Sequence, residues 1–195
     1  MAGSKPRLVY LETADGAPPD EALARAGAAG DLRAVEELYR RYQGSVIGYL
    51  QRLVRDSDSA VDLFMEAFFR AYVNLKSFDP RRSFRPWLYR IATNVGHDWL
   101  RQQTRALPPA EAAGDPSVLD AVAERELSRQ VEAVVADLPA EQRTAFILRH
   151  YQGLSYAEIA GVCNCPEGTV RSRMHYAVRV LRARLRFLVE EGDER

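Results

Sequence analysis

Residues 155–181 read SYAEIAGVCNCPEGTVRSRMHYAVRVL, and they predict two helices joined by a tight turn. Ser155, followed three residues later by Glu158, forms a capping box, a pattern typical of a helix start. The turn ends at Pro166, where a second helix can begin. The apolar positions of that helix recur at intervals of four, three and four and therefore share one inward face: Val170, Met174, Ala177 and Leu181.

The opposite face of the second helix is basic and polar. It carries Arg171, Ser172, His175, Arg179 and Arg182. A helix that reads duplex DNA needs an apolar back and a front whose first turns offer hydrogen-bond donors to base edges, while later arginines meet phosphates. The segment therefore favours a helix-turn-helix that enters the major groove. The alternative is an amphipathic helix hairpin with a solvated basic surface.

The charge pattern supports a nucleic-acid partner, although the formal net charge is zero. Residues 81–105 have a net charge of +5, residues 106–137 of −5, and residues 141–189 of +5. Basic blocks of this kind suit a polyanion, because each neutralised phosphate releases counterions. Charge runs are also common on solvated helix faces, so charge alone does not decide between the two interpretations.

Outward from the motif, apolar residues recur every three or four positions, which predicts an all-α fold. Helices are expected from Asp20, from Asp31, after 55–59 and from Ser83, with Asp20 and Asp31 as candidate caps. Residues 102–117 hold three prolines and a glycine and mark a linker. The predicted organisation is a flexible arm (1–19), a helical domain (20–104), a flexible acidic linker (105–126) and a second helical domain with the helix-turn-helix (127–188).

Several classes of protein are disfavoured. No apolar run approaches the ~20 residues that span a bilayer, and no signal peptide opens the chain, so a cytoplasmic location is expected. Cys163 and Cys165 are too close for an unstrained disulfide and too few for a zinc site. The chain lacks HExxH, GxxxxGK[ST] and GxSxG motifs. His97, His150 and His175 lie on separate predicted helices, so no catalytic site, metal or cofactor is expected.

Two blocks of sequence resemble one protein family. Residues 138–185 are similar to region 4 of the extracytoplasmic-function sigma factors, above all at GLSYAEIA (153–160) and CPEGTVRSR (165–173). Residues 29–43, 60–79 and 83–101 resemble region 2 of that family. The resemblance covers about four fifths of the chain, in the family's order. It implies a subunit that binds RNA polymerase core and directs it to promoters, without catalysis of its own.

The resemblance implies a site for the clamp helices of the largest polymerase subunit on the helix near 60–76. The matching positions are Asp62, Leu63, Glu66, Phe69 and Arg70. Met65 stands where glutamine is usual and Val61 where an acid is usual, so this surface departs from the family in detail. Considered without the family, Asp62 and Glu66 would be ordinary solvated acids.

The resemblance also implies two DNA sites. The site for the minus-ten element, read as a single strand with flipped bases, comprises Phe78, Arg81, Arg82, Ser83, Phe84, Arg85, Arg90 and Asn94. The duplex minus-thirty-five site comprises Thr169, Arg171, Ser172, Arg173, His175, Tyr176 and Arg179. Within it, Arg171, Ser172 and His175 are expected to read bases, and Thr169, Arg173 and Arg179 to meet phosphates. Tyr176 stands where the family often has arginine, which leaves the promoter preference open.

The resemblance further implies an anti-sigma factor as a partner, no membrane contact by this chain itself, and a monomer when free. One rival is a conventional regulator with an unrelated sensor domain, which would bind palindromic duplex DNA as a dimer. It explains 155–181 but not the region 2 blocks. An enzyme is the second rival, and it lacks any supporting motif.

Overall fold

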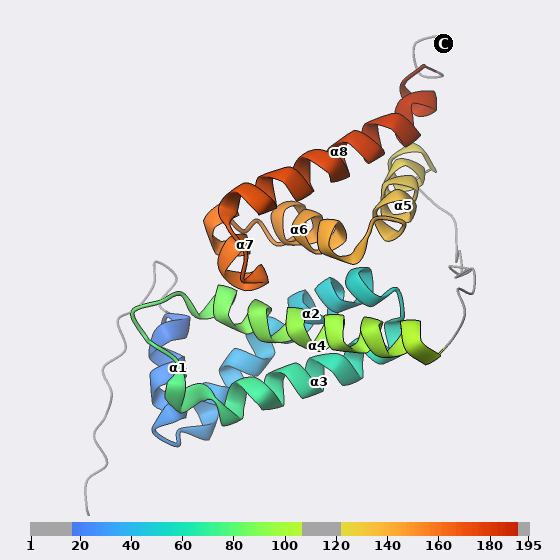
Figure 1. Cartoon of the computed structure of the whole chain (residues 1–195). Coiled ribbons are helices and arrows are strands. Elements are labelled where there is room, and N and C mark those ends of the chain that lie inside the picture. The colour runs from blue at the N-terminus through green and yellow to red at the C-terminus, as the bar shows by residue number, and fades with distance from the viewer. Residues whose placement is uncertain (1–16, 107–121, 191–195) are drawn as a thin grey trace, which may run out of the picture.

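The computed structural model describes residues 17–106 and 122–190. All regular elements in these two ranges are helical, and they form two units that lie one above the other (Figure 1). The first unit comprises α1 (Asp20–Ala28), α2 (Leu32–Val54), α3 (Ser57–Val73), the 3-10 helix η1 (Leu75–Ser77) and α4 (Phe84–Ala106). The second comprises α5 (Val122–Ala136), α6 (Ala140–His150), α7 (Tyr156–Cys163) and α8 (Glu167–Glu190). The prediction of an all-α fold with two helical domains is confirmed.

The start of α2 follows from its sequence. Gly30 adopts φ +96°, which favours glycine and lets the chain leave α1. The Asp31 carboxylate then accepts hydrogen bonds from the backbone N–H groups of Arg33 (3.0 Å) and Ala34 (3.4 Å). The expected cap at Asp20 is wrong. Pro19 is the N-cap of α1, and the Asp20 carboxylate instead binds Arg41 and Tyr42 on α2.

The first unit is built around α2, which packs against α1, α3 and α4. Its inward face carries Leu38, Val46, Tyr49, Leu50 and Leu53, all of them buried. Such a long helix needs tertiary packing of an apolar face more than intrinsic propensity. The packing of α3 and α4 against α2 therefore determines which of their residues face solvent.

The second unit contains the expected helix-turn-helix. Ser155 and Glu158 form the capping box at the start of α7, with the Ser155 side chain accepting from the Glu158 N–H. Asn164 ends α7 in the left-handed conformation at φ 48°. Val170, Met174, Ala177 and Leu181 of α8 are buried, as the periodicity predicted.

Helix boundaries differ from the expected ones in three places. The helix α4 continues to Ala106, and α5 already begins at Val122, so both enter the segment expected as linker. The helix α3 ends at Val73 and is followed by η1, although the Asp79-Pro80 pair, which disfavours a continuing helix, comes only six residues later. The linker residues 107–121 and the arm 1–16 lie outside the described residues.

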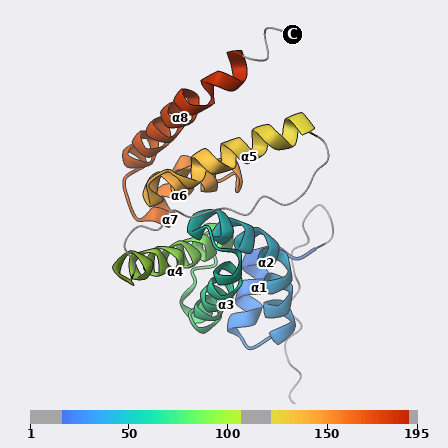
Figure 2. The same cartoon turned by 90° about the vertical axis from the view of Figure 1, so that its right-hand side faces the viewer.

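The two units contact each other directly, with α4 against α7 and α2 against α6 (Figure 2). One contact joins His97 of α4 to Thr144 of α6, at 2.8 Å between Nε2 and Oγ1. Thr144 is fully buried, and its hydroxyl donates to the Ala140 carbonyl at 2.8 Å. The hydroxyl proton is thereby used, so His97 Nε2 carries a proton and donates to Thr144.

Two glycines provide a test of the packing. A Cβ at Gly96 would lie 2.7 Å from Leu53 Cδ2 of α2, whereas a Cβ at Gly44 would meet nothing within 4 Å. We expect Gly96→Ala to lower the free energy of unfolding by about 1–3 kcal/mol. In contrast, Gly44→Ala should raise it by about 0.5–1 kcal/mol, since alanine is the better helix former. Urea denaturation of the three proteins measures both effects, and equal stability of the two variants would contradict the close approach of α4 to α2.

A second test concerns pH. Burial lowers the pKa of His97 below its ordinary value of 6.5, with Arg101 and Arg173 opposing the charged form and Glu141 and Asp98 favouring it. The folded protein therefore binds fewer protons here than the unfolded chain, so stability is lost as pH falls below about 6.5. We expect the loss between pH 7 and pH 5 to be smaller in His97→Gln. Burial also lowers the pKa of His150. Protonation of His150 should therefore cause part of the stability loss that persists in His97→Gln. The matched control is His175→Gln, at an exposed position, and a wild-type slope in His97→Gln would refute the assignment.

Candidate promoter and polymerase surfaces

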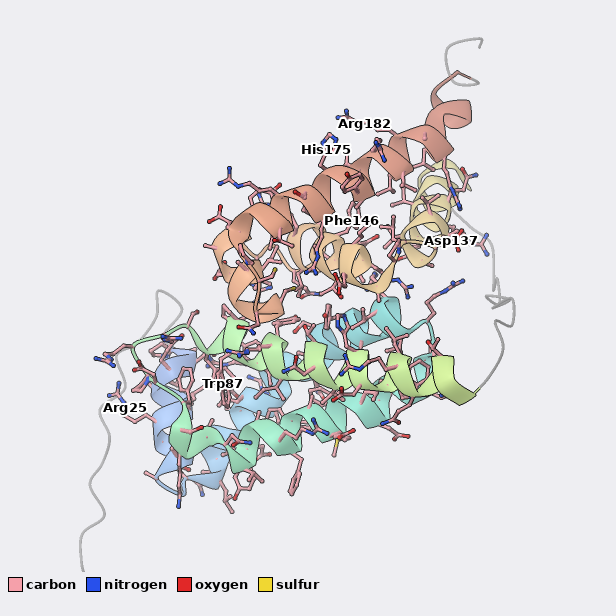
Figure 3. The ribbon with its side chains drawn as sticks, in the orientation of Figure 1. Arg25, Trp87, Asp137, Phe146, His175 and Arg182 are labelled. Atoms are coloured by element: carbon pink, nitrogen blue, oxygen red, sulfur yellow. The ribbon has the colours of Figure 1, made fainter. Side chains whose placement is uncertain are left out.

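The front of α8 is open to solvent. Arg171, Ser172, His175, Tyr176, Arg179 and Arg182 are all exposed. His175 and Arg182 lie on the side of α8 that faces away from the first unit (Figure 3). The predicted base-reading residues are therefore together on one accessible helix face.

Arg171 is held in place at the beginning of this face. Its guanidinium donates to Glu167, one helical turn earlier, at 2.6 Å. It also lies 5.9 Å from the ring centroid of Tyr156 on α7, within cation–π range. The Ser172 hydroxyl donates back to the Gly168 carbonyl at 3.1 Å. Further along, the guanidinium of Arg179 stacks over the Tyr176 ring at 4.9 Å.

Arg173 does not lie with the others. Only 20% of its side chain is exposed, because the guanidinium bonds Glu141 on α6 and contacts the Cys165 sulfur at 3.6 Å. Thr169 is half-buried in the first turn of α8. In this arrangement Arg173 ties α8 to α6, and it could reach a phosphate only after its bond to Glu141 is broken.

A second candidate site lies on the first unit, where the end of α3 meets α4. A cavity of about 310 Å³ is lined there by Arg70, Asn74, Ser77, Trp87, Arg90, Ile91 and Asn94. Trp87 and Ile91 offer apolar surface, Asn94 an exposed amide, and Arg70 and Arg90 positive charge. A pocket with these groups suits an unstacked base next to its backbone phosphates.

Sequence reasoning identified only part of this pocket. It placed Asn94 and Arg90 in the minus-ten site but did not include Asn74, Ser77 or Trp87 there. The Ser77 hydroxyl donates to the Asn74 carbonyl at 2.7 Å, which fixes the corner between α3 and η1. No sequence signal singled out Asn74 or Ser77, because their closeness to Asn94 comes from the packing of α3 on α4.

Phe78 and Phe84 were expected beside the bases, but both are buried. Their ring centroids lie 5.5 Å apart, and each lies within 5.5 Å of Trp87. Because they are buried, the rings of Phe78 and Phe84 cannot stack on a base in this conformation. Their positions show that they anchor both ends of the loop 79–83 instead.

The loop residues themselves point outward. Arg81, Arg82 and Ser83 are exposed, with Arg81 bonded to Asp79 at 3.0 Å. Arg85 differs from them, because its guanidinium donates to the Gln152 carbonyl of the second unit. Of the four arginines expected in the minus-ten site, Arg85 is the one that bonds across the contact between the units.

Four of the five α3 residues expected to bind polymerase are exposed to solvent. Asp62, Glu66, Phe69 and Arg70 are exposed, and Glu66 pairs with Arg70 at 2.5 Å. Leu63 is only 6% exposed and packs in the core, so it cannot contact a partner directly. An exposed apolar stripe, of which sequence reasoning had included only Phe69, runs along the same helix: Val61, Met65, Phe69, Tyr72 and Val73. Their spacing of four, four, three and one residues along the sequence is the pattern from which the stripe could have been predicted.

The two cysteines lie at the turn between α7 and α8, and both are half-buried. Burial raises the pKa of Cys163 to about 11, so its thiol is protonated at neutral pH and a poor nucleophile. Over the described residues, no group of three or more potential ligands could hold a metal ion. These observations favour packing as the role of the cysteines.

Comparison with known proteins identifies the two units. Residues 38–106 match the family model for sigma-70 region 2, and residues 128–181 match that for sigma-70 region 4. The RNA polymerase sigma-H factor of Pseudomonas aeruginosa is 35% identical over 89% of this chain and 97% of its own length. The ECF RNA polymerase sigma-E factor of Haemophilus influenzae is 36% identical over 87% of this chain and 97% of its own length. This chain belongs to the extracytoplasmic-function sigma factors.

As a sigma factor of this family, the chain directs promoter-specific transcription and is not itself an enzyme. A solved structure of CnrH in complex with the cytosolic domain of CnrY superposes with a TM-score of 0.67 at 27% identity. It covers 85% of this chain and 96% of CnrH, so the similarity extends over both units. None of the described helices is long and apolar enough to cross a membrane.

The α3 surface can be tested by a matched pair. Leu63→Ala should lower the free energy of unfolding by about 2–5 kcal/mol, as expected for a buried leucine. Phe69→Ala, at a ring that is 65% exposed, should change it by no more than about 0.5 kcal/mol. Chemical denaturation measures both, and a strongly destabilised Phe69→Ala would show that this ring belongs to the core.

Proposed function

We propose that this sigma factor captures the melted minus-ten strand in the pocket between α3 and α4. The 310 Å³ cavity, with Asn94 exposed in its wall, is the observation that carries this assignment. Trp87 and Ile91 would receive the face of an unstacked base, and Arg90 its phosphate. Trapping unpaired bases offsets the few kcal/mol that unstacking costs at each step.

The exposed face of α8 would read the minus-thirty-five element in the major groove. Arg171 is the best placed for base contact, because Glu167 and Tyr156 orient it in the first turns of the helix. Ser172 and His175 lie on the same exposed face. Arg179 and Arg182 follow further along and would meet phosphates, and the exposed Tyr176 lies beside Arg179.

The apolar stripe and flanking charges of α3 would bind polymerase core. Solvent-exposed Val61, Met65 and Phe69 on successive turns support an interface, since contiguous exposed apolar surface commonly marks one. Asp62, Glu66 and Arg70 border the stripe and would supply polar contacts. The expected partner is the pair of clamp helices in the largest subunit, which would place the chain in the cytoplasm.

An anti-sigma factor is the second expected protein partner. CnrH was solved with the cytosolic domain of CnrY bound, and a sigma factor RpoE was solved with the anti-sigma factor NepR from Bartonella quintana. A comparable inhibitor would control this chain, which we expect to be monomeric when free.

The test is transcription with purified sigma-free polymerase core and a library of genomic promoter fragments. The wild-type chain should start transcripts at a defined set of promoters. Asn94→Ala should impair melting, and Arg171→Ala should remove discrimination at one minus-thirty-five base pair, worth about 1–3 kcal/mol. Sequencing of the transcript starts gives the promoter set and its consensus.

Arg33→Ala is the matched control, because Arg33 is exposed at the start of α2 and belongs to none of the three proposed surfaces. It should leave the promoter set unchanged. Phe69→Ala should weaken core binding in a pull-down while leaving the fold intact. Tight binding of a palindromic duplex by the chain alone, without any binding to core, would contradict the roles proposed for α3, α4 and α8.

A further inference from the structure

Three side chains on the outer face of α8 form a small cluster: His175, Tyr176 and Arg179. The guanidinium carbon of Arg179 lies 4.9 Å from the centroid of the Tyr176 ring, which is within cation–π range. The His175 ring meets the Tyr176 ring nearly edge-on, with 6.0 Å between centroids and 75° between ring planes. All three residues are exposed, so the packing of the hydrophobic core does not require them to meet.

Tyr176 lies on the side of α8 that points away from the core. Its neighbours Met174 and Ala177 are buried, whereas the Tyr176 side chain is 46% exposed. Ser172 lies four residues before Tyr176 and Arg179 three residues after it, so all three are on one side of the helix. The ring is therefore placed among the groups that we propose for the minus-thirty-five element.

The chemistry of a tyrosine side chain limits which base it can distinguish. Every base pair presents a hydrogen-bond acceptor in the major groove, so a single phenol hydroxyl distinguishes the pairs poorly. Tyrosine also lacks the two parallel hydrogen-bonding groups with which arginine reads guanine and asparagine reads adenine. Thymine alone carries a methyl group in the groove, and apolar side chains recognise it. The discriminating contact open to Tyr176 is therefore an apolar one, to a thymine methyl.

Arg179 differs from the other arginines near the start of α8 in its partner. Arg171 pairs with Glu167 and Arg173 with Glu141. Arg179 pairs with no carboxylate among the described residues and lies over an aromatic ring instead. A guanidinium on a ring keeps its full charge and its hydrogen-bond donors, while the stack restricts its motion. It is thus prepared for a phosphate without an acid to displace.

We propose that Tyr176 is a specificity-determining residue whose ring contacts the methyl group of a thymine and holds the Arg179 guanidinium against a neighbouring phosphate. This inference rests on the proposed function of α8 and adds the identity of one base. Tyr176 follows Arg171 by five residues, or about 7.5 Å along the helix axis. That rise exceeds the step of about 3.4 Å between base pairs, so the two residues reach different pairs. The minus-thirty-five element should therefore contain an A·T pair beside the pair that Arg171 reads.

Replacing thymine with uracil removes the methyl group and changes nothing else. The probes are duplex promoter fragments that wild-type holoenzyme, reconstituted from core and the full chain, selects from a genomic library. Each thymine of the minus-thirty-five element, on either strand, is replaced in turn by deoxyuridine, and equilibrium binding of holoenzyme is measured. One of these replacements should weaken wild-type binding by about fourfold, the value for one buried CH₂ group.

Two variants at one position form the matched pair. Tyr176→Phe keeps the ring and should keep the uracil effect at the same thymine. Tyr176→Ala removes the ring and should bind the thymine and uracil fragments equally well. Because the side chain is exposed, both variants should fold, and urea denaturation checks this. A selected element without any A·T pair, or an alanine variant that keeps the uracil effect, would overturn the inference.

The contact of Arg179 has a different signature. Arg179→Ala should weaken binding to all fragments alike and reduce the salt dependence, the slope of log K against log salt, by about one. Arg179→Lys retains the charge and should retain that slope. The loss in the double variant Tyr176→Ala, Arg179→Ala should be smaller than the product of the two single losses, because the residues act as a pair. Independent losses would overturn the shared role.

Arg171→Ala separates this inference from the proposed function. If Arg171→Ala leaves holoenzyme binding to the selected promoters unchanged, α8 does not read the element, and both the proposed function and the role of Tyr176 fail. If Arg171→Ala weakens binding while no uracil replacement does, the proposed function stands and the assignment of Tyr176 to a thymine is overturned.

Discussion

The buried hydroxyl of Tyr49 sets a constraint that organises much of the molecule. Tyr49 is fully buried on α2, where a phenol without a hydrogen-bond partner would be costly. Its partner is Thr93 on α4, at 2.8 Å, and Thr93 in turn donates to the Tyr89 carbonyl at 2.7 Å. The Tyr89 ring packs edge-on against the Tyr49 ring, and its hydroxyl reaches Gln152 of the second unit. A chain of satisfied polar groups therefore runs from the centre of the first unit to its contact with the second.

This series of hydrogen bonds fixes the rotation of α4 about its own axis. With Tyr89 and Thr93 directed toward α2 and the second unit, Arg90 and Asn94, one position further on, face solvent. Successive helical positions differ by about 100°, so one orientation of α4 sets both the buried hydrogen bonds and the exposure of the two groups proposed to bind DNA. Close approach at Gly96, where a Cβ would meet Leu53, locks the same helix against α2. Packing and the proposed promoter contact are thus linked through the geometry of a single helix.

The sequence was sufficient to predict the helices and to predict which residues of α8 are exposed to solvent. Periodic apolar residues and the capping box at Ser155 are local signals, and both appear in the structure as predicted. Burial was harder to predict. Leu63, Phe78 and Phe84 matched functional positions of the family, but each lies in the core, because residues next to a site commonly support it without touching the ligand. Asp20 looked like a cap, although its carboxylate meets Arg41 and Tyr42 about twenty residues away. The hydrogen bond between Tyr89 and Gln152 depends on how the two units meet, which no periodicity within either unit encodes.

The apolar stripe on α3 also bears on how much of this protein a cell can hold. Phe69, Met65 and Val61 lie on successive turns and are 65%, 51% and 46% exposed. Such surfaces favour self-association and capture by chaperones and proteases when their partner is scarce. We therefore expect the chain to be short-lived whenever its supply exceeds that of free polymerase. The abundance of this sigma factor would then be matched to that of its partner by turnover, in addition to any control of its synthesis.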